Sequence, residues 1–414
     1  MSIYKNAISL LIMQGVNYLI PLITLPYLTR VLGGYQYGVL STALVFAQYV
    51  ILVVDFGFNL SATKKISEQQ NNIAYINKVY WHTIISKAIL FVISLTISLT
   101  VITSINKYHS ILLIYIYCLP QVIGSIIFPV WLFQGIEKIK LISILTIIPK
   151  LLVIPLLFLF VKKNNDVVNS ALILSMPLFF SAVLSVFVVR RLGIKRIKEI
   201  SLKSIVLYID DSFHYFIGSV AISVYTLSTP IILSWVSSYQ EVGYYSAADK
   251  LRAAMLGVFL ILGQAIYPRA NSLMANSKCD YYIFLRKLIK YQVVFCSITA
   301  VLFYFVMPTL APFVLGASFS HIGILLKVMS PMIVIIPLSV ILANCIILPH
   351  GKSRAYAFIP WGTAILHIPY AYFLCKSYGA LGGSVAILIT EIFSFLVLFV
   401  YCFNMGFLKK VLWS

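Results

Sequence analysis

Several ionisable side chains lie inside long apolar stretches of this chain, where a charge is costly unless it has a partner or a ligand. They are the cations Arg30, Lys87, Lys150, Lys250 and Arg252 and the acids Asp55, Asp249 and Glu391. Cations outnumber acids in this set, so it is suited to bind an anion. Lys150 is the clearest case, because it lies in the middle of its apolar stretch between two prolines.

Most of these residues also have a purely structural interpretation. Lys87 either faces a polar cavity or extends its side chain to the membrane surface. Asp249 and Arg252 are three residues apart, so on a helix they either pair with each other or face a ligand. Arg30 either anchors a helix end at the interface or attracts an anion there. For Lys150 we expect a cavity or a buried partner.

Two polar stripes accompany the charges, each on one face of an expected helix. They consist of Gln14, Asn17, Pro21 and Thr24 in one helix and Ser219, Ser223 and Thr226 in another. Amide and hydroxyl side chains suit the hydroxyl groups of a sugar, although Ser and Thr also mediate helix packing. Because the stripes occupy equivalent places in the two halves of the chain, we expect them to line a wet central surface.

The elements that hold these residues are long apolar helices. The mean hydropathy is +0.99, and only 10% of the 414 residues are charged, against about 25% in soluble domains. The apolar runs have the length of membrane-spanning helices, not of the shorter alternating strands of a barrel. We expect twelve spans, near 8–29, 38–60, 82–105, 111–133, 141–161, 168–189, 213–235, 242–267, 288–310, 323–347, 356–375 and 380–405.

The longest polar stretch follows the sixth span and divides the chain into two halves. We expect an N-terminal lobe at 1–194, a cytoplasmic amphipathic linker at 195–212 and a C-terminal lobe at 213–414. In the linker, isoleucines recur at helical spacing between basic residues, which predicts a short helix on the membrane surface; a plain linker is the alternative. These isoleucines are Ile197, Ile200, Ile205 and Ile209.

The net charge of +20 is explained by topology. Most Lys and Arg residues fall in segments on the same side as the N-terminus, which predicts that both termini are cytoplasmic. Anionic membrane lipids are a sufficient partner for these charges, and no nucleic acid is required. The six cysteines show neither disulfide nor metal-site spacing. We expect no cofactor and no cleaved signal peptide.

An internal repeat supports two pseudo-symmetric lobes of six helices around a central cavity. The segments LPYLTRVLGGYQYGVLSTA (25–43) and PIILSWVSSYQEVGYYSAA (230–248) both begin with a proline near a helix end. Both then cross a Tyr- and Gln-containing turn and enter the next helix through Gly-x-x-Ser-x-Ala. Six helices separate the copies, so the copies have the same orientation in the membrane.

Five segments resemble the Wzx-type O-antigen flippases, polysaccharide-transport members of the superfamily that also contains the MATE multidrug exporters. They are QGVNYLIPLITLPYLTRVLGGYQYGVLS (14–41), DFGFNLSATKKIS (55–67), PVWLFQGIEK (129–138), YYSAADKLR (244–252) and QAIYPR (264–269). The resemblance implies a MATE-like fold with alternating access, and it implies that Arg30, Lys87, Lys150 and Arg252 stand where such proteins carry cations.

The implied activity is transfer of an undecaprenyl-pyrophosphate-linked O-unit from the cytoplasmic to the periplasmic leaflet of a bacterial inner membrane. The implied partners are this lipid-linked oligosaccharide, membrane lipids, an O-antigen polymerase and a chain-length regulator. Coupling to H⁺ or Na⁺ stays open, with the three acids as candidates.

Three alternative functions fit the sequence less well. A MATE-like cation antiporter would need more acids than this set holds. A membrane enzyme such as an O-antigen polymerase is disfavoured by the short expected periplasmic loops. A channel is disfavoured because no filter-like segment is repeated.

Overall fold

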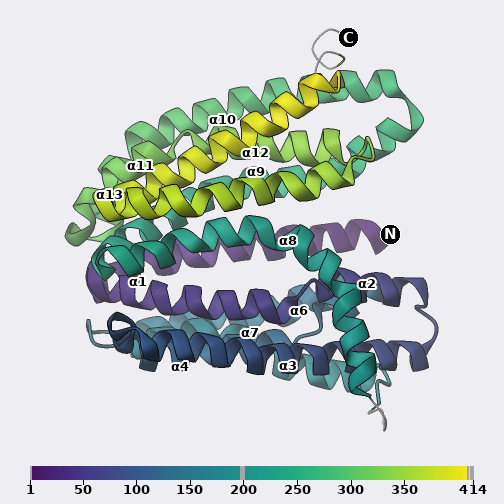
Figure 1. Ribbon diagram of the computed structural model, residues 1–414, viewed down its shortest axis with the longest axis horizontal. Helices are drawn as coiled ribbons and strands as arrows, with labels where there is room; N and C mark the ends of the chain where they lie inside the picture. The colour runs from purple at the N-terminus through teal and green to yellow at the C-terminus, as the bar shows by residue number, and fades with distance from the viewer. Residues whose placement is uncertain (1, 196–200, 408–409, 411–414) are drawn as a thin grey trace. The chain divides into compact units, whose positions relative to one another are not determined.

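The computed structural model describes residues 2–195, 201–407 and 410, in which helices are joined by short turns (Figure 1). In the N-terminal half the helices are α1 (Ser2–Asp55), α2 (Phe58–Glu68), α3 (Ile73–Ser104), η1 (Asn106–Ile111), α4 (Leu112–Ile127), α5 (Val130–Gly135), α6 (Ile139–Phe160) and α7 (Val167–Arg191). They are followed by α8 (Leu202–Val236), α9 (Tyr239–Asn276), α10 (Lys278–Leu315), η2 (Ala317–Ile322), α11 (Gly323–Met329), α12 (Met332–Val340), η3 (Ile341–Ile347) and α13 (Ser353–Asn404).

The chain folds into two compact units, and two helices contribute to both. Unit 1 comprises Met1–Ile20 and Gln36–Ser223, and unit 2 comprises Pro21–Tyr35 and Val224–Ser414. The boundaries therefore fall inside α1 and inside α8. Each unit has its own apolar core, built around Trp131 in unit 1 and around Tyr281 in unit 2.

The expected lobe and linker boundaries stay predictions. Ile197 and Ile200, which contributed to the linker prediction, lie outside the described residues.

The helices have the length and composition of membrane spans, which confirms an all-helical multi-pass membrane protein. Among the described residues, seven helical stretches are long and apolar enough to cross a membrane, or up to nine if two bent helix pairs each form one span. Two of the stretches each contain two expected spans, because α1 continues through a break at Gly33 and α13 through a break at Gly379. The number twelve stays a prediction.

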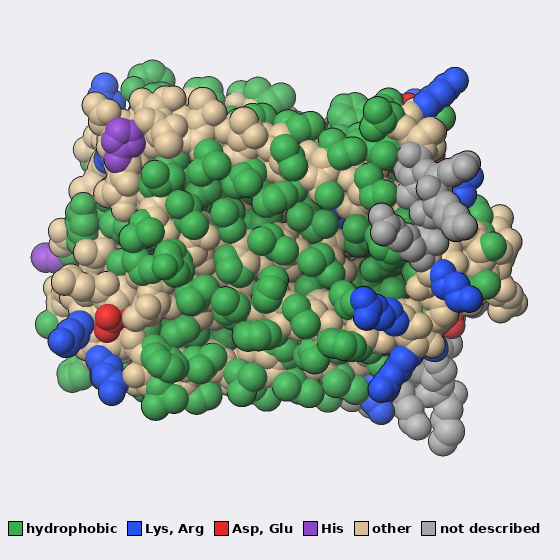
Figure 2. Space-filling view, turned by 90° about the horizontal axis from the view of Figure 1, so that it is seen from below, with side chains coloured by type: hydrophobic (Ala, Val, Ile, Leu, Met, Phe, Trp, Pro, Cys, Tyr) green, Lys and Arg blue, Asp and Glu red, His purple; other side chains and the backbone are tan. Residues whose placement is uncertain are grey.

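The distribution of side chains on the surface agrees with a membrane-spanning position of the helices. Figure 2 shows a face whose centre is covered by hydrophobic side chains, with Lys and Arg gathered toward its two ends. An apolar band between two charged zones is the pattern that a bilayer with polar interfaces selects.

The break in α13 is fixed by a carboxylate from α9. Gly379 has φ 57° and ψ −134°, a conformation that is essentially restricted to glycine. The Glu241 Oε2 atom accepts a hydrogen bond of 2.6 Å from the Ala380 N–H, and a Cβ at Gly379 would lie 2.5 Å from that oxygen. Glu241 thus caps the second half of α13, which carries Glu391.

A histidine lies in the turn after η3, outside the candidate spans. The His350 Nδ1 is 2.7 Å from the Ile346 carbonyl oxygen, and the imidazole packs on the Phe407 ring with 3.9 Å between centroids. Burial lowers the pKa of His350 below 6.5, and the nearby Lys410 and Lys278 lower it further against the opposing effect of the Ile346 hydrogen bond.

We predict that acid loosens the chain around Phe407. Because the folded-state pKa of His350 lies below the unfolded value of 6.5, its stabilisation is complete above that value and is lost as the pH falls through the folded pKa. The hydrogen-exchange protection factors of residues 398–407, corrected for the intrinsic exchange rate at each pH, should fall between about pH 7.5 and about pH 5. In the His350→Phe variant this pH dependence should disappear. The same pH dependence in wild type and variant would show that His350 is not its source.

Candidate functional site

The most distinctive charge is Lys150 in α6, where it belongs to unit 1. Its ammonium donates a hydrogen bond to the Asn17 Oδ1 atom in α1, and both side chains are half-buried. Within the described residues, the ion pairs involve Lys65, Lys87 and Arg252, but not Lys150. An ammonium held by a neutral amide in apolar surroundings keeps its charge uncompensated, which favours an anionic ligand.

Lys87 in α3, also in unit 1, is already neutralised. Its Nζ lies 2.7 Å from Asp55 Oδ1 and 3.1 Å from the Ser125 carbonyl oxygen. The Lys87 side chain is 1% exposed, whereas that of Asp55 is 32% exposed. The idea that Lys87 extends to the membrane surface is therefore wrong. Asp55 ends α1, at the point where Phe56 and Gly57 take positive φ angles and turn the chain into α2.

Arg252 in α9 is paired in the interior of unit 2. Its Nε and Nη2 atoms donate hydrogen bonds of 3.1 and 2.5 Å to Asp249 Oδ1. Glu391, from α13, is buried and accepts a 3.1 Å hydrogen bond from the Tyr225 hydroxyl. The structural interpretation of the Asp249–Arg252 spacing is thus confirmed, and this cation is compensated within the fold.

A buried histidine to which no sequence motif pointed extends the polar interior of unit 2. The His367 Nε2 lies 3.0 Å from Thr229 Oγ1, and its Nδ1 lies 2.6 Å from Thr390 Oγ1. The Tyr370 hydroxyl is 2.5 Å from the same Thr390 oxygen. Tyr370 follows His367 by three residues, which places both on one helix face. Their partners lie elsewhere in the chain, so spacing alone did not reveal the cluster.

Arg30 contacts the end of α10 within unit 2. Its guanidinium donates to the Phe313 carbonyl in the last turn of α10, where a cation is favourable. Its side chain also covers Gly316, whose φ is 100°, and a Cβ there would lie 3.1 Å from Arg30 Cγ. Lys250 is partly buried in α9.

Both polar stripes cross the boundary between the units. Gln14 and Asn17 belong to unit 1 and Thr24 to unit 2. Ser219 and Ser223 belong to unit 1 and Thr226 to unit 2. Gln14, Asn17, Ser223 and Thr226 are half-buried and Thr24 is buried, while the side chain of Ser219 lies outside the described set. The structure does not bring either stripe together within a single unit.

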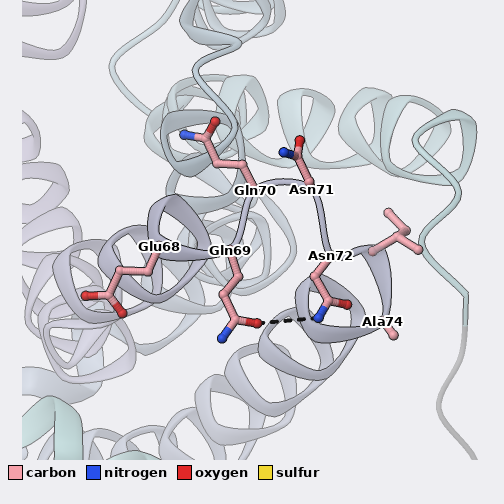
Figure 3. A pocket seen from close by; sticks show the side chains of 7 residues that line it. Glu68, Gln69, Gln70, Asn71, Asn72 and Ala74 are labelled. Carbon is pink, nitrogen blue, oxygen red and sulfur yellow. Dashed lines mark hydrogen bonds between the residues drawn. The ribbon is translucent and has the colours of Figure 1, made fainter.

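A depression of about 630 Å³ lies at the turn between α2 and α3 and is lined by residues 68–74 (Figure 3). The Asn72 Nδ2 donates a 3.5 Å hydrogen bond to Gln69 Oε1, and all seven residues are exposed. A single solvated turn forms this depression, and none of the expected site residues lines it.

Sequence comparisons identify similar proteins over nearly the whole chain. The profile of the family described as "Polysaccharide biosynthesis protein" matches residues 3–274. A Shigella dysenteriae protein named "Putative O-antigen transporter" is 34% identical over 393 residues, covering 94% of this chain and 97% of that protein. A protein of the same name from Escherichia coli (strain K12) is 29% identical, covering 94% of each chain.

Solved structures share the fold at low sequence identity. The lipid II flippase MurJ, in an inward closed conformation, superposes with a TM-score of 0.74 at 14% identity, covering 99% of this chain and 89% of that one. An inward-facing MATE family multidrug resistance transporter superposes with a TM-score of 0.72 at 15% identity, covering 94% and 95%. The expected MATE-like fold is therefore confirmed.

Proposed function

Because this chain belongs to the polysaccharide biosynthesis family, we propose that it is an O-antigen flippase. Its cargo is an undecaprenyl-pyrophosphate-linked repeat unit, and it carries this cargo from the cytoplasmic to the periplasmic leaflet of a bacterial inner membrane. The two relatives are named as transporters, which agrees with the resemblance to the Wzx-type flippases. Their names also disfavour the membrane-enzyme alternative.

The observation that supports the proposal most directly is the uncompensated charge of Lys150. A pyrophosphate is a dense anion, and an ammonium shielded from water attracts it more strongly than an exposed one does. Lys87 and Arg252 already have carboxylate partners, so we assign the principal anion contact to Lys150. Asn17 holds the ammonium, and the stripe residue Gln14, one helical turn before Asn17, would contact the sugars.

Several finer features belong to the same proposal. The twelve expected spans would form two lobes, and the cavity between the lobes would open alternately to the cytoplasm and to the periplasm. Both termini would lie in the cytoplasm. The sugar would cross along the polar stripes while the polyprenyl tail stays in lipid. Asp55, Asp249 and Glu391 are the candidate groups for coupling to H⁺ or Na⁺. An O-antigen polymerase and a chain-length regulator are the proposed protein partners.

The test is deletion of the gene in its host. We expect the lipid-linked O-unit to accumulate on the cytoplasmic side and the O-antigen ladder of lipopolysaccharide to disappear, because the charged sugar cannot cross the bilayer unaided. A plasmid copy of the wild-type gene should restore the ladder. O-units that still reach the periplasm at the normal rate would refute the proposal.

The same strain distinguishes the MATE-like alternative. The fold is shared with a MATE transporter, but the uncompensated charge in unit 1 is a cation, which repels cationic drugs. Drug susceptibility should therefore stay unchanged in the deletion strain. Increased susceptibility with an intact O-antigen ladder would favour the drug exporter.

A further inference from the structure

The first part of α8, residues 202–218, is attached to unit 1 along one face. The Ser212 Oγ lies 2.7 Å from Ser61 Oγ of α2, and the Ser204 Oγ lies 3.0 Å from His82 Nε2 of α3. Ile205 on the same face is 4% exposed. One isoleucine that predicted this helix therefore packs on the protein.

An ion pair and a tight backbone contact fix the rotation of this segment about its axis. The Lys65 Nζ is 2.9 Å from Asp211 Oδ2 and 3.7 Å from the centre of the Tyr208 ring. A Cβ at Gly57 would lie 2.6 Å from the Phe216 backbone nitrogen, so the chain approaches the segment too closely for any side chain. The segment cannot turn another face to unit 1 without losing these contacts.

A second apolar face of the segment is left largely uncovered. Leu202 and Val206 are 76% and 64% exposed, and Phe213, whose ring centre lies 6.1 Å from that of Phe56, is 43% exposed. At about 100° per helical residue, these three side chains lie within about 40° of one another. The exposed residues Lys203, Asp210 and His214 form the next sector around the helix. Leu207 is the one exposed large apolar residue of this segment outside the stripe.

The position of the segment indicates what covers this stripe. Residues 202–218 join the apolar part of α8, residues 220–236, through a bend of 66°, so they lie at the end of a candidate span, at the membrane boundary. In Figure 1 the segment runs steeply across the long helices of unit 1, near α2. A helix that crosses the direction of the spans at their end lies along the membrane plane.

We propose that Leu202, Val206 and Phe213 insert into the phospholipid leaflet at this end of unit 1. The sector of Lys203, Asp210 and His214 then faces water, and the sector of Ser204, Ile205 and Ser212 faces the protein. In this orientation the apolar sector contacts lipid, the charged sector contacts water, and the third sector contacts the protein. The segment is thus a membrane anchor for unit 1, and this role does not depend on which cargo is carried.

The test uses spin labels on the full-length protein in vesicles of phosphatidylethanolamine and phosphatidylglycerol. Cys279, the exposed one of the six cysteines, is replaced by Ser, and a label is attached at Val206→Cys or, as the matched control, at Asp210→Cys. We expect the label at 206 to collide more with oxygen, which partitions into lipid, than with a water-soluble nickel chelate. The label at 210 should show the opposite preference.

Two results would overturn the proposal. A label at 206 that is as accessible to the nickel chelate as the label at 210 would place the stripe in water. A label at 206 that is shielded from both reagents would show that a second copy or another protein covers it. Both labelled variants must elute like the wild type in size-exclusion chromatography, so that a misfolded protein is not scored.

Discussion

The Asn17→Asp variant is expected to abolish most O-antigen export while the protein remains folded and abundant. The substitution keeps the size of the side chain and an oxygen facing the Lys150 ammonium, but it adds a negative charge. Two unit charges about 4 Å apart attract by about 4 kcal/mol at an effective dielectric constant of about 20. The internal carboxylate would therefore compete with the pyrophosphate for Lys150. The site would become equivalent to the compensated pair of Lys87 and Asp55.

The expected magnitude follows from the strength of charge-assisted hydrogen bonds. A loss of about 1.5–3 kcal/mol corresponds to about a ten- to hundredfold decrease in export. The O-antigen ladder, normalised to the amount of tagged protein in the membrane, measures it. Lys150→Gln should show a similar loss, and Lys150→Arg should retain much of the activity because the charge is kept.

Asn17→Ser is the matched control, because it keeps a neutral polar side chain and should leave export largely intact. If Asn17→Asp exported O-antigen at the wild-type rate with normal abundance, Lys150 would not bind the anion. That result would not argue against the proposed flippase activity, because the gene deletion tests this activity separately.

How much of this arrangement could be predicted depends on the separation of the partners along the chain. The long apolar runs determine the helices, because each run can satisfy its backbone groups only within itself in lipid. Asp249 and Arg252 are three residues apart on one helix, so their pairing was one of two interpretations that spacing allowed. In these cases the relevant distance is set by helix geometry alone.

The remaining contacts depend on tertiary packing, which spacing does not encode. Lys87 and Asp55 come from different helices, and His367 finds its partners on α8 and on the second half of α13. The boundary of the units within α1 is a further example. Pro21 follows that boundary directly, and its ring interrupts the helical hydrogen bonds, but the sequence does not show to which unit each half of the helix belongs.

The Asp55→Asn variant is expected to destabilise the protein by about 3 kcal/mol, because it leaves Lys87 charged and buried without a partner. Lys87 is 1% exposed, and the amide that replaces the carboxylate cannot neutralise it. The reverse change, Lys87→Met, should cost less. It leaves Asp55 without its partner, but that side chain is 32% exposed and can be hydrated in part. The two single substitutions of one ion pair should therefore have unequal effects.

The measurement is thermal unfolding in detergent, followed by size-exclusion chromatography of the heated samples. The double variant Asp55→Asn/Lys87→Met removes both charges and should recover most of the stability that Asp55→Asn loses. Equal losses for the two single variants would mean that the Lys87 ammonium reaches water on its own. Lys87 would then be available to an anionic ligand, and the assignment of the anion contact would have to include it beside Lys150. The inequality is thus a test of which cation in unit 1 is already compensated, and the choice of Lys150 depends on it.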